Sequence, residues 1–350
     1  MNQTTVGSVL PKMRLPLVRK SPPLFCLASA FFGITSVAAA TTPLPKLNLA
    51  SDLTVSGLSS GGYMAAQFHV AFSNQVQGAA IIAAGPVYCA QNSLAIAFGN
   101  CLNQANSQPK LSAAATYLKA QQYDGTIDNL QNLKDDKVWL FHGTADVTVA
   151  SSVSDSLAVQ YQTLVEPANI RYVDDQKFAH HFPTNSTSGN DCLTSEAPFL
   201  GNCQYDAAGL MLAHLLPKLT PKAVAASGTL HLINQFEMAA GAKGQLAQTG
   251  YLYVPQSCSK GQKCQLHVSF HGCKQYAGAV GDAYARGTGL NEYADTNHLV
   301  VLYPQTEKSS VAPLNPSGCW DWWGYSGENY ATKQGPQMAA VKQLIDALSK

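Results

Sequence analysis

A serine flanked by glycines is the first candidate for chemistry in this chain. Residues 57–61 read G-L-S-S-G, which is the pattern G-x-S-x-G centred on Ser59. A short apolar run at 53–55 precedes the pattern, and a helix-like stretch at 63–72 follows it. Between a strand and a helix, the glycines permit a tight turn that lifts the serine hydroxyl above the sheet, at a helix N-terminus that favours negative charge. Ser59 is the expected nucleophile, because Ser60 would have leucine, not glycine, two residues before it.

A serine nucleophile requires a general base. Residues 178–184 read F-A-H-H-F-P-T and follow a strand expected at 170–173, so His180 and His181 lie in a loop after a strand. Most of the other histidines fall within expected helices or strands or have no chemical neighbours. The residue types alone leave the choice between His180 and His181 open.

The carboxylate that orients such a base is expected one strand–helix unit upstream. A strong strand signal at 137–142 (K-V-W-L-F-H) runs into G-T-A-D, which ends at Asp146. In α/β-hydrolases the acid and the histidine occupy successive loops after strands, in the chain order Ser, Asp, His. Asp146 satisfies that order, whereas the alternative acids Asp174 and Asp175 adjoin the histidine loop itself.

The remaining requirement is a pair of backbone N–H groups aimed at the oxyanion. One should belong to Ser60, directly after the nucleophile. The other normally comes from a loop on an earlier strand, but here the His-Gly loop lies far downstream, at His271-Gly272-Cys273, after a strand expected at 266–270. This rotated order predicts a circularly permuted hydrolase, because a sheet can be closed from either chain end when the termini lie together.

The elements that must position these groups alternate between strand and helix patterns. Strands are expected at 53–55, 78–84, 137–142, 170–173, 250–254, 265–270 and 298–303, and helices at 63–72, 112–123, 152–164, 207–216, 288–297 and 335–348. Such alternation predicts an α/β fold with a mostly parallel sheet and helices on both faces. We expect a single catalytic domain over residues 41–350.

The first forty residues have the pattern of a secretory signal peptide. Four basic residues between positions 12 and 20 precede an apolar run at 24–37, and Ala38-Ala39-Ala40 follows it. The run is shorter than the roughly 20 residues of a membrane span, and the small residues suit a cleavage site. We therefore expect cleavage after residue 40, no stable membrane insertion, and secretion into the medium or a periplasm.

Composition excludes one class of partner. The 350 residues include 22 Lys+Arg and 21 Asp+Glu, with a formal net charge of +1. No basic field is available to bind a nucleic-acid backbone. With 46% hydrophobic and 12% charged residues, the chain should bury a large core, and we expect a monomer.

Cysteines give a further expectation. Of nine, one lies in the leader, and an even number in an exported chain indicates disulfides. Loop-like spacers suggest the sequential pairs Cys89–Cys101, Cys192–Cys203 and Cys258–Cys264, which leaves Cys273–Cys319 as the fourth. No C-x-x-C pair occurs, so no metal site is expected.

Five segments, G-L-S-S-G-G-Y-M-A, F-H-G-T-A-D, A-H-H-F-P-T, S-F-H-G-C-K-Q and G-C-W-D-W-W-G-Y, together resemble secreted polyhydroxybutyrate (PHB) depolymerases. More narrowly, they are similar to the single-domain, circularly permuted type. The resemblance implies Ser59 as nucleophile, Asp146 as acid and His180 as base. It also implies that the amides of Ser60 and Cys273 form the oxyanion hole.

The run W-D-W-W-G-Y at 320–325 carries the expectation about substrate. Aromatic faces beside a nucleophile suit a polyester with apolar methyl groups, and the resemblance places a tryptophan of this segment at the cleft. If the segment is extended, alternation sends Trp320 and Trp322 one way and Trp323 the other, so some of these rings should be exposed. Trp320 and Trp323 are the expected contacts. The expected function is hydrolysis of poly(3-hydroxybutyrate) or its oligomers through an acyl-enzyme, without metal or organic cofactor. The alternatives are a secreted feruloyl or acetyl esterase of plant polysaccharide and a non-catalytic polymer-binding protein.

Overall fold

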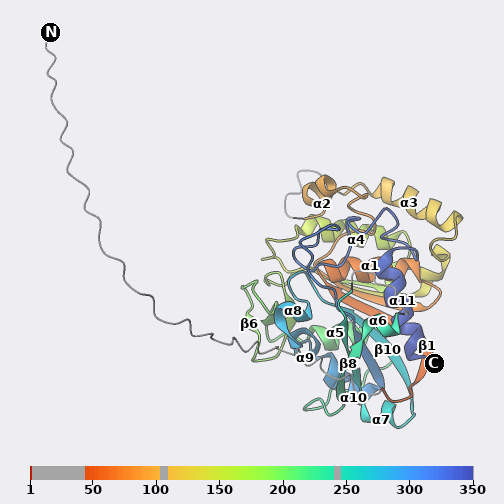
Figure 1. Ribbon diagram of the computed structural model, residues 1–350. Coiled ribbons are helices and arrows are strands. Elements are labelled where there is room, and N and C mark those ends of the chain that lie inside the picture. Colours follow the sequence, from red (N-terminus) through yellow and green to blue (C-terminus); the bar gives the residue numbers. More distant parts are fainter. Residues whose placement is uncertain (2–43, 103–108, 240–245, 350) are drawn as a thin grey trace, which may run out of the picture. The chain divides into compact units, whose positions relative to one another are not determined.

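A computed structural model describes residues 1, 44–102, 109–239 and 246–349 (Figure 1). The chain divides into two units, Met1–Ala40 and Thr41–Lys350, and the sheets, helices and cleft all belong to the second. Apart from Met1, the expected signal peptide at 1–40 lies outside the described residues. Within the described ranges, no helix is long and apolar enough to cross a membrane.

An eight-stranded sheet organises the second unit. Its spatial order is β4-β3-β2-β1-β10-β11-β9-β8. The strands are β1 (Asn48–Leu58), β2 (Val76–Ile82), β3 (Lys137–Phe141), β4 (Ile170–Val173), β8 (Thr229–Asn234), β9 (Thr249–Val254), β10 (Lys263–Phe270) and β11 (Leu299–Tyr303). Strand β9 is antiparallel to both of its neighbours, and the other pairs are parallel. The expected α/β-hydrolase fold with a mostly parallel sheet is confirmed.

The centre of the sheet joins distant parts of the chain. Strand β1 pairs in parallel with β10, and Gly57 lies opposite Phe270. Strand β10, which leads into the His-Gly loop, therefore lies beside β1, which leads into Ser59, although β10 comes far later in the sequence. This is the arrangement that the rotated motif order predicted.

Helices cover both faces of the sheet. On one side, α1 (Ser60–Ala71), α4 (Ser151–Gln162) and α11 (Pro336–Leu348) pack on inward-facing strand residues, and on the other α5 (Ala207–Leu215), α9 (Ala283–Gly287) and α10 (Leu290–Asn297) do so. Along β2, Ala79 and Ile81 belong to the first core and Ala80 and Ile82 to the second. This follows from the two-residue period of a strand, which sends successive side chains to opposite faces. The remaining helices are α2 (Leu94–Asn100), α3 (Leu111–Tyr123), α6 (Gln235–Met238), α7 (Gln256–Ser259) and α8 (Ala277–Val280), with short 3₁₀ turns at Leu130–Asp135 and Pro167–Asn169.

A second, small sheet follows the histidine loop, where the sequence indicated only a loop. It consists of β5 (Phe182–Thr184), β7 (Leu200–Asn202) and β6 (Asn190–Asp191), all parallel. Strands of two or three residues are too short to produce a detectable alternation. The four disulfides have the expected pairing, Cys89–Cys101, Cys192–Cys203, Cys258–Cys264 and Cys273–Cys319.

Candidate active site

The turn that carries Ser59 requires its glycines. Ser59 connects β1 to α1 with φ 57° and ψ −122°, a backbone conformation that is costly for a residue with a side chain. A Cβ atom at Gly57 would lie 2.1 Å from the carbonyl oxygen of Gly61, and one at Gly61 would lie 2.2 Å from that of Phe270. Both glycines are therefore needed for the turn to close against the end of β10.

Asp146 and His180 form a buried pair at the carboxyl edge of the sheet. The Nδ1 atom of His180 lies 2.6 Å from Oδ2 of Asp146. The other carboxylate oxygen accepts the N–H groups of Thr148 and Val149, at 2.7 and 3.0 Å. Burial raises the pKa of the Asp146 carboxyl, but the charge and hydrogen bond of His180, together with the backbone N–H of Val149, outweigh it and leave that pKa below its ordinary value. Because this carboxylate only accepts hydrogen bonds, Nδ1 of His180 carries a proton and Nε2 is left to act as a base.

The structure separates the two adjacent histidines. His181 is buried, and its Nε2 lies 2.8 Å from the carbonyl oxygen of Cys192. No carboxylate among the described residues bonds to it, and it does not line the cleft that holds Ser59 and His180. The alternative acids Asp174 and Asp175 are exposed. His180 with Asp146 is thus the combination that the geometry brings together.

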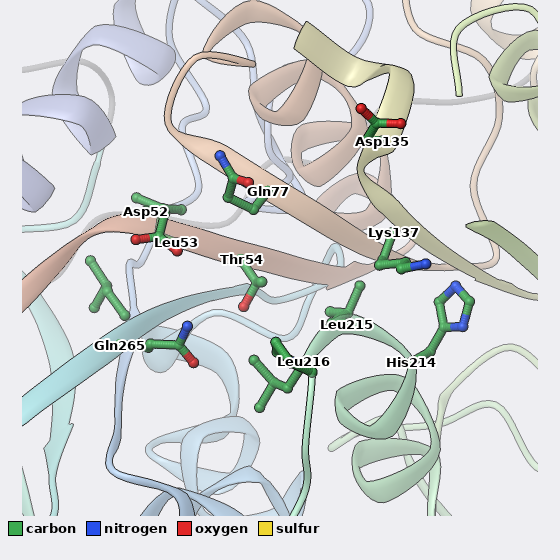
Figure 2. A pocket seen from close by; sticks show the side chains of 12 residues that line it. Asp52, Leu53, Thr54, Gln77, Asp135, Lys137, His214, Leu215, Leu216 and Gln265 are labelled. Atoms are coloured by element: carbon green, nitrogen blue, oxygen red, sulfur yellow. The ribbon is translucent and has the colours of Figure 1, made fainter. Parts of the chain in front are cut away.

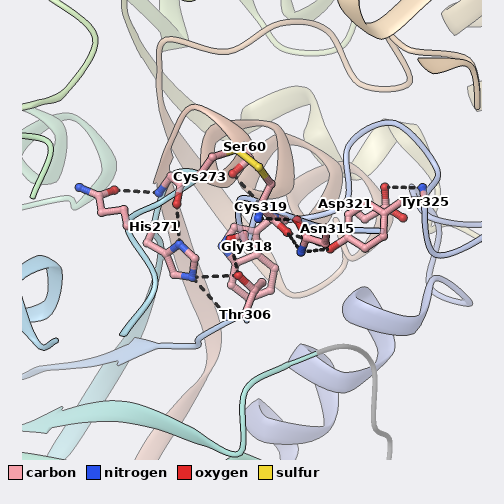
Figure 3. Close-up of a disulfide and its surroundings, with 12 residues drawn as sticks. Ser60, His271, Cys273, Thr306, Asn315, Gly318, Cys319, Asp321 and Tyr325 are labelled. Carbon is pink, nitrogen blue, oxygen red and sulfur yellow. Dashed lines mark hydrogen bonds between the residues drawn. A yellow bond between two sulfur atoms is a disulfide. The ribbon is translucent and has the colours of Figure 1, made fainter. Parts of the chain in front are cut away.

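The His-Gly loop lies directly beside the serine turn. A Cβ atom at Gly272 would lie 3.5 Å from Cβ of Ser59. The backbone N–H groups of Ser60 and Cys273 have no hydrogen-bond acceptor among the residues that the structure describes. Cys273 is tied by its disulfide to Cys319 (Figure 3). Two unsatisfied donors next to a serine are what an oxyanion hole needs.

His271 orients one of these donors. Its Nδ1 lies 2.7 Å from the carbonyl oxygen of Gly272, so Nδ1 carries the proton, and its Nε2 accepts the N–H of Thr306 at 3.2 Å (Figure 3). Complete burial lowers the pKa of His271 to about 4, which keeps the ring neutral and preserves this arrangement at neutral pH. In a planar trans peptide the C=O and N–H groups point in opposite directions. By holding the oxygen of Gly272 on one side, His271 directs the N–H of Cys273 to the other.

Gln275 fixes the preceding peptide of the same loop. Its Oε1 accepts the N–H of Gly272 at 2.8 Å, and its Nε2 donates to the carbonyl oxygens of Pro198 and Phe199 at 2.9 and 3.1 Å. Both peptides that flank Gly272 are therefore held by buried side chains. Sequence reasoning missed this role of Gln275, because a glutamine three residues after a glycine has no distinctive pattern.

A cleft of about 1020 Å³ opens at these groups. Ser59 and His180 both line it, as does the His-Gly loop. Most of the other lining residues are apolar or aromatic and come from α1, the segment around α2, and the loop at 312–325: Tyr63, Leu94, Ala97, Phe98, Leu102, Ala312, Leu314, Pro316, Trp322, Trp323 and Tyr325.

A second cavity, of about 290 Å³, shares no lining residue with this cleft. Figure 2 shows the side chains that line it. Its lining includes Asp52, Gln77, Lys137 and Gln265, which stand in the first residues of parallel strands or close to them. The amino ends of parallel strands meet at the edge opposite the carboxyl ends. This cavity therefore shares no edge with Ser59.

Two tryptophans line the cleft. Trp323, one of the two expected contacts, is among its lining residues. Trp322, which was not among them, lines it as well and stacks on Tyr63 at a centroid distance of 4.6 Å. Both rings lie in the segment that follows Cys319, which the disulfide ties to the oxyanion loop.

The expectation for Trp320 is wrong. Its side chain is 0% exposed, packs edge-on against Phe270 at a centroid distance of 5.0 Å, and does not line the cleft. The segment is not extended, so strand-like alternation does not apply to it. Instead, the buried carboxylate of Asp321 accepts the backbone N–H groups of residues 323–326 at 2.7–3.2 Å and curls the chain around itself.

One group of metal-ligand residue types occurs in the described part of the chain: His181, Cys192 and Cys203. Both cysteine sulfurs are joined in a disulfide bond. They are therefore not available as thiolate ligands.

Comparison with known proteins identifies the family. The family model "Esterase PHB depolymerase" matches residues 249–349. A curated polyhydroxybutyrate depolymerase of Talaromyces funiculosus is 37% identical over 333 residues, covering 89% of this chain and 95% of the relative. The chain belongs to the PHB depolymerase family.

Other members agree with this assignment. A poly(3-hydroxybutyrate) depolymerase of Delftia acidovorans is 43% identical over 328 residues, which cover 92% of this chain but only 64% of that longer protein. Among solved structures, a PHB depolymerase complexed with an R3HB trimer superposes with a TM-score of 0.81 at 35% identity, covering 87% of this chain and 99% of the other. The PHB depolymerase from Penicillium funiculosum gives 0.80 at 36% identity, with coverages of 88% and 98%. The resemblance expected from the five sequence segments is confirmed.

Proposed function

We propose that this family member is a carboxylic ester hydrolase that cleaves poly(3-hydroxybutyrate) or its oligomers through an acyl-enzyme intermediate. The observation that carries the proposal is that one cleft is lined by a serine on a strained turn, by a carboxylate-paired histidine and by a loop with a free N–H group. Family membership and the relatives named as PHB depolymerases support the substrate.

In the proposed reaction, Ser59, His180, Asp146 and the two backbone N–H groups each have a separate role. Oγ of Ser59 attacks the ester carbonyl carbon, while Nε2 of His180 takes the hydroxyl proton and Asp146 stabilises the resulting imidazolium. The N–H groups of Ser60 and Cys273 bind the oxyanion. When the tetrahedral intermediate collapses, His180 protonates the departing hydroxyl end of the polymer. Water, deprotonated by the same histidine, then attacks the acyl-enzyme and releases a carboxylate and free Ser59.

The surroundings of the cleft favour an uncharged, apolar polymer. Three large apolar side chains at its mouth are mostly exposed: Leu94 (56%), Phe98 (56%) and Leu314 (60%). Exposed apolar residues that cluster around a binding cleft indicate contact with an apolar partner. A polyester with a methyl group on every unit supplies such a surface, and a solved relative is described as complexed with an R3HB trimer.

The test is incubation of the protein with amorphous poly(3-hydroxybutyrate), followed by mass analysis of the soluble products. We expect 3-hydroxybutyrate or its oligomers from the wild type and almost none from Ser59→Ala, which should fold normally. Release of ferulate or acetate from plant polysaccharide, without clearing of the polyester, would instead indicate the related esterase activity. Binding of the polymer without turnover, and without labelling by a serine-directed organophosphate, would indicate a non-catalytic binding protein.

We also propose that the protein is secreted after cleavage near residue 40 and acts as a monomer with one catalytic domain over 41–350. Four disulfides support an oxidising compartment, because such bonds rarely persist in a reducing cytosol. N-terminal sequencing of the protein from the culture medium and light scattering of the purified enzyme test these two statements.

A further inference from the structure

Among the residues that the structure describes, the cleft is lined by a single permanently charged side chain. Among the described residues that line it there is no carboxylate, and Lys274 is the only lysine or arginine. Its side chain is exposed, and no residue in the described ranges forms an ion pair or hydrogen bond with its ammonium group. Of the seven ion pairs among the described residues, only that of His180 with Asp146 involves a residue that lines the cleft, and the other six lie elsewhere. A cation without a protein partner is therefore available to a ligand in this cleft.

The backbone of Lys274 is held in place by its neighbours. The residue follows Cys273, so its Cα lies about 3.8 Å from the Cα of a residue that offers an N–H group to the oxyanion. Its own N–H donates to the carbonyl oxygen of Ser317 at 2.7 Å, and the disulfide of Cys273 with Cys319 anchors the loop on the same side. Lys274 has φ 60°, in the left-handed region. That conformation is costly for lysine and persists only where the surroundings determine it.

The chemistry of the substrate supplies one matching anion. Interior units of poly(3-hydroxybutyrate) are neutral esters, whereas each hydrolysis leaves a carboxylate on one product and a hydroxyl on the other. We propose that Lys274 binds the terminal carboxylate of 3-hydroxyalkanoate chains and oligomers, so that the cleft distinguishes a free chain end from a chain interior. This inference rests on the proposed function and names a subsite of the same cleft.

The expected change in KM follows from the exposure of the Lys274 side chain to solvent. An ammonium–carboxylate pair that remains in contact with water is weak and is screened by salt. Loss of the charge should therefore raise KM for a substrate with a free carboxylate by about two- to fivefold at low salt. The same change should leave KM unaltered for a substrate whose carboxylate is esterified.

The experiment compares the 3-hydroxybutyrate trimer as free acid with its methyl ester. Lys274→Gln is expected to raise KM for the acid only, and 0.5 M NaCl is expected to abolish the difference between the variant and the wild type. Lys274→Arg, which keeps the charge, should behave as the wild type. Lys308→Gln is the matched control, because Lys308 is exposed and outside the cleft lining, and its loss changes the net charge equally.

Each outcome decides the question. Equal effects of Lys274→Gln on the acid and the methyl ester, or the same selective effect from Lys308→Gln, would overturn the carboxylate subsite while leaving the hydrolase intact. Failure of the wild type to hydrolyse either trimer or the polymer would overturn the proposed function, and the subsite with it. A selective rise in KM for the acid that salt removes would establish the subsite.

Discussion

The orientation of the Cys273 N–H by His271 makes a prediction that two substitutions can separate. The ring donates through Nδ1 to the carbonyl oxygen of Gly272 and accepts through Nε2 from the N–H of Thr306. Asparagine can place its amide nitrogen near the Nδ1 position, and glutamine can place its amide oxygen near the Nε2 position. His271→Asn therefore keeps the orienting bond, and His271→Gln keeps the bond to Thr306.

The expected magnitude for His271→Gln follows from the bond that is lost. A neutral hydrogen bond of this kind contributes about 0.5–1.5 kcal/mol, and 1.36 kcal/mol corresponds to a tenfold change in rate. We expect kcat to fall about two- to tenfold with KM nearly unchanged. The upper bound is complete loss of one oxyanion donor, which costs about 10²–10³ in kcat.

His271→Asn should show the opposite pattern. It leaves the fully buried Thr306 N–H without an acceptor, which costs about 1–3 kcal/mol of unfolding free energy, while kcat stays near the wild-type value. Turnover of a small p-nitrophenyl ester and urea unfolding measure the two quantities. If His271→Asn loses as much kcat as His271→Gln, or if both variants lose only stability, the orienting role of Nδ1 is refuted.

Two further predictions concern the aromatic segment and acid stability. Trp323→Ala should raise KM for oligomers with little change in the melting temperature, whereas Trp320→Ala should lower the free energy of unfolding by about 3–5 kcal/mol because it empties a fully buried site. The reverse pattern in oligomer kinetics and thermal melts would show that the two rings are wrongly assigned. Burial lowers the pKa of His267 to about 3 and that of His271 to about 4, from an ordinary 6.5, so below pH 6.5 the unfolded chain binds protons that the folded protein does not. As the pH falls from 6.5 to 4, the free energy of unfolding should therefore decrease by up to about 1.36 kcal/mol per pH unit for each histidine. Urea titrations at several pH values measure this slope. If His267→Gln does not reduce the slope, the assignment of the acid sensitivity to these histidines is wrong.

Local requirements made part of the site predictable from the sequence. The turn at Ser59 depends on glycines two residues to either side, and these are visible in the sequence as a fixed spacing. The loops that hold Asp146 and His180 follow strands whose apolar runs are equally visible. The pairing of β1 with β10 could be expected as well, because the His-Gly loop had to reach the serine whatever its place in the chain.

The choice between neighbours was not predictable in this way. His180 and His181 are adjacent in a loop, and only the hydrogen bond to Asp146 and the buried contact with Cys192 distinguish them. Each of those partners is brought in by a separate element, Asp146 after β3 and Cys192 after the short β6. A residue type cannot report which of two partners its side chain will meet.

The aromatic segment at 319–326 was even less predictable from the sequence. Segment 319–326 has no helix or strand, so its conformation has no period that a sequence pattern could display. It is held by the disulfide of Cys319 and by the carboxylate of Asp321, which satisfies four consecutive backbone N–H groups. Alternation along an extended segment would place Trp320 and Trp322 on one face and Trp323 on the other, whereas the curl around Asp321 buries Trp320 and directs Trp322 and Trp323 to the cleft. Because side-chain bonds rather than a repeating backbone pattern determine the conformation of this segment, the side chains that it turns toward the cleft follow from the three-dimensional structure and not from residue spacing.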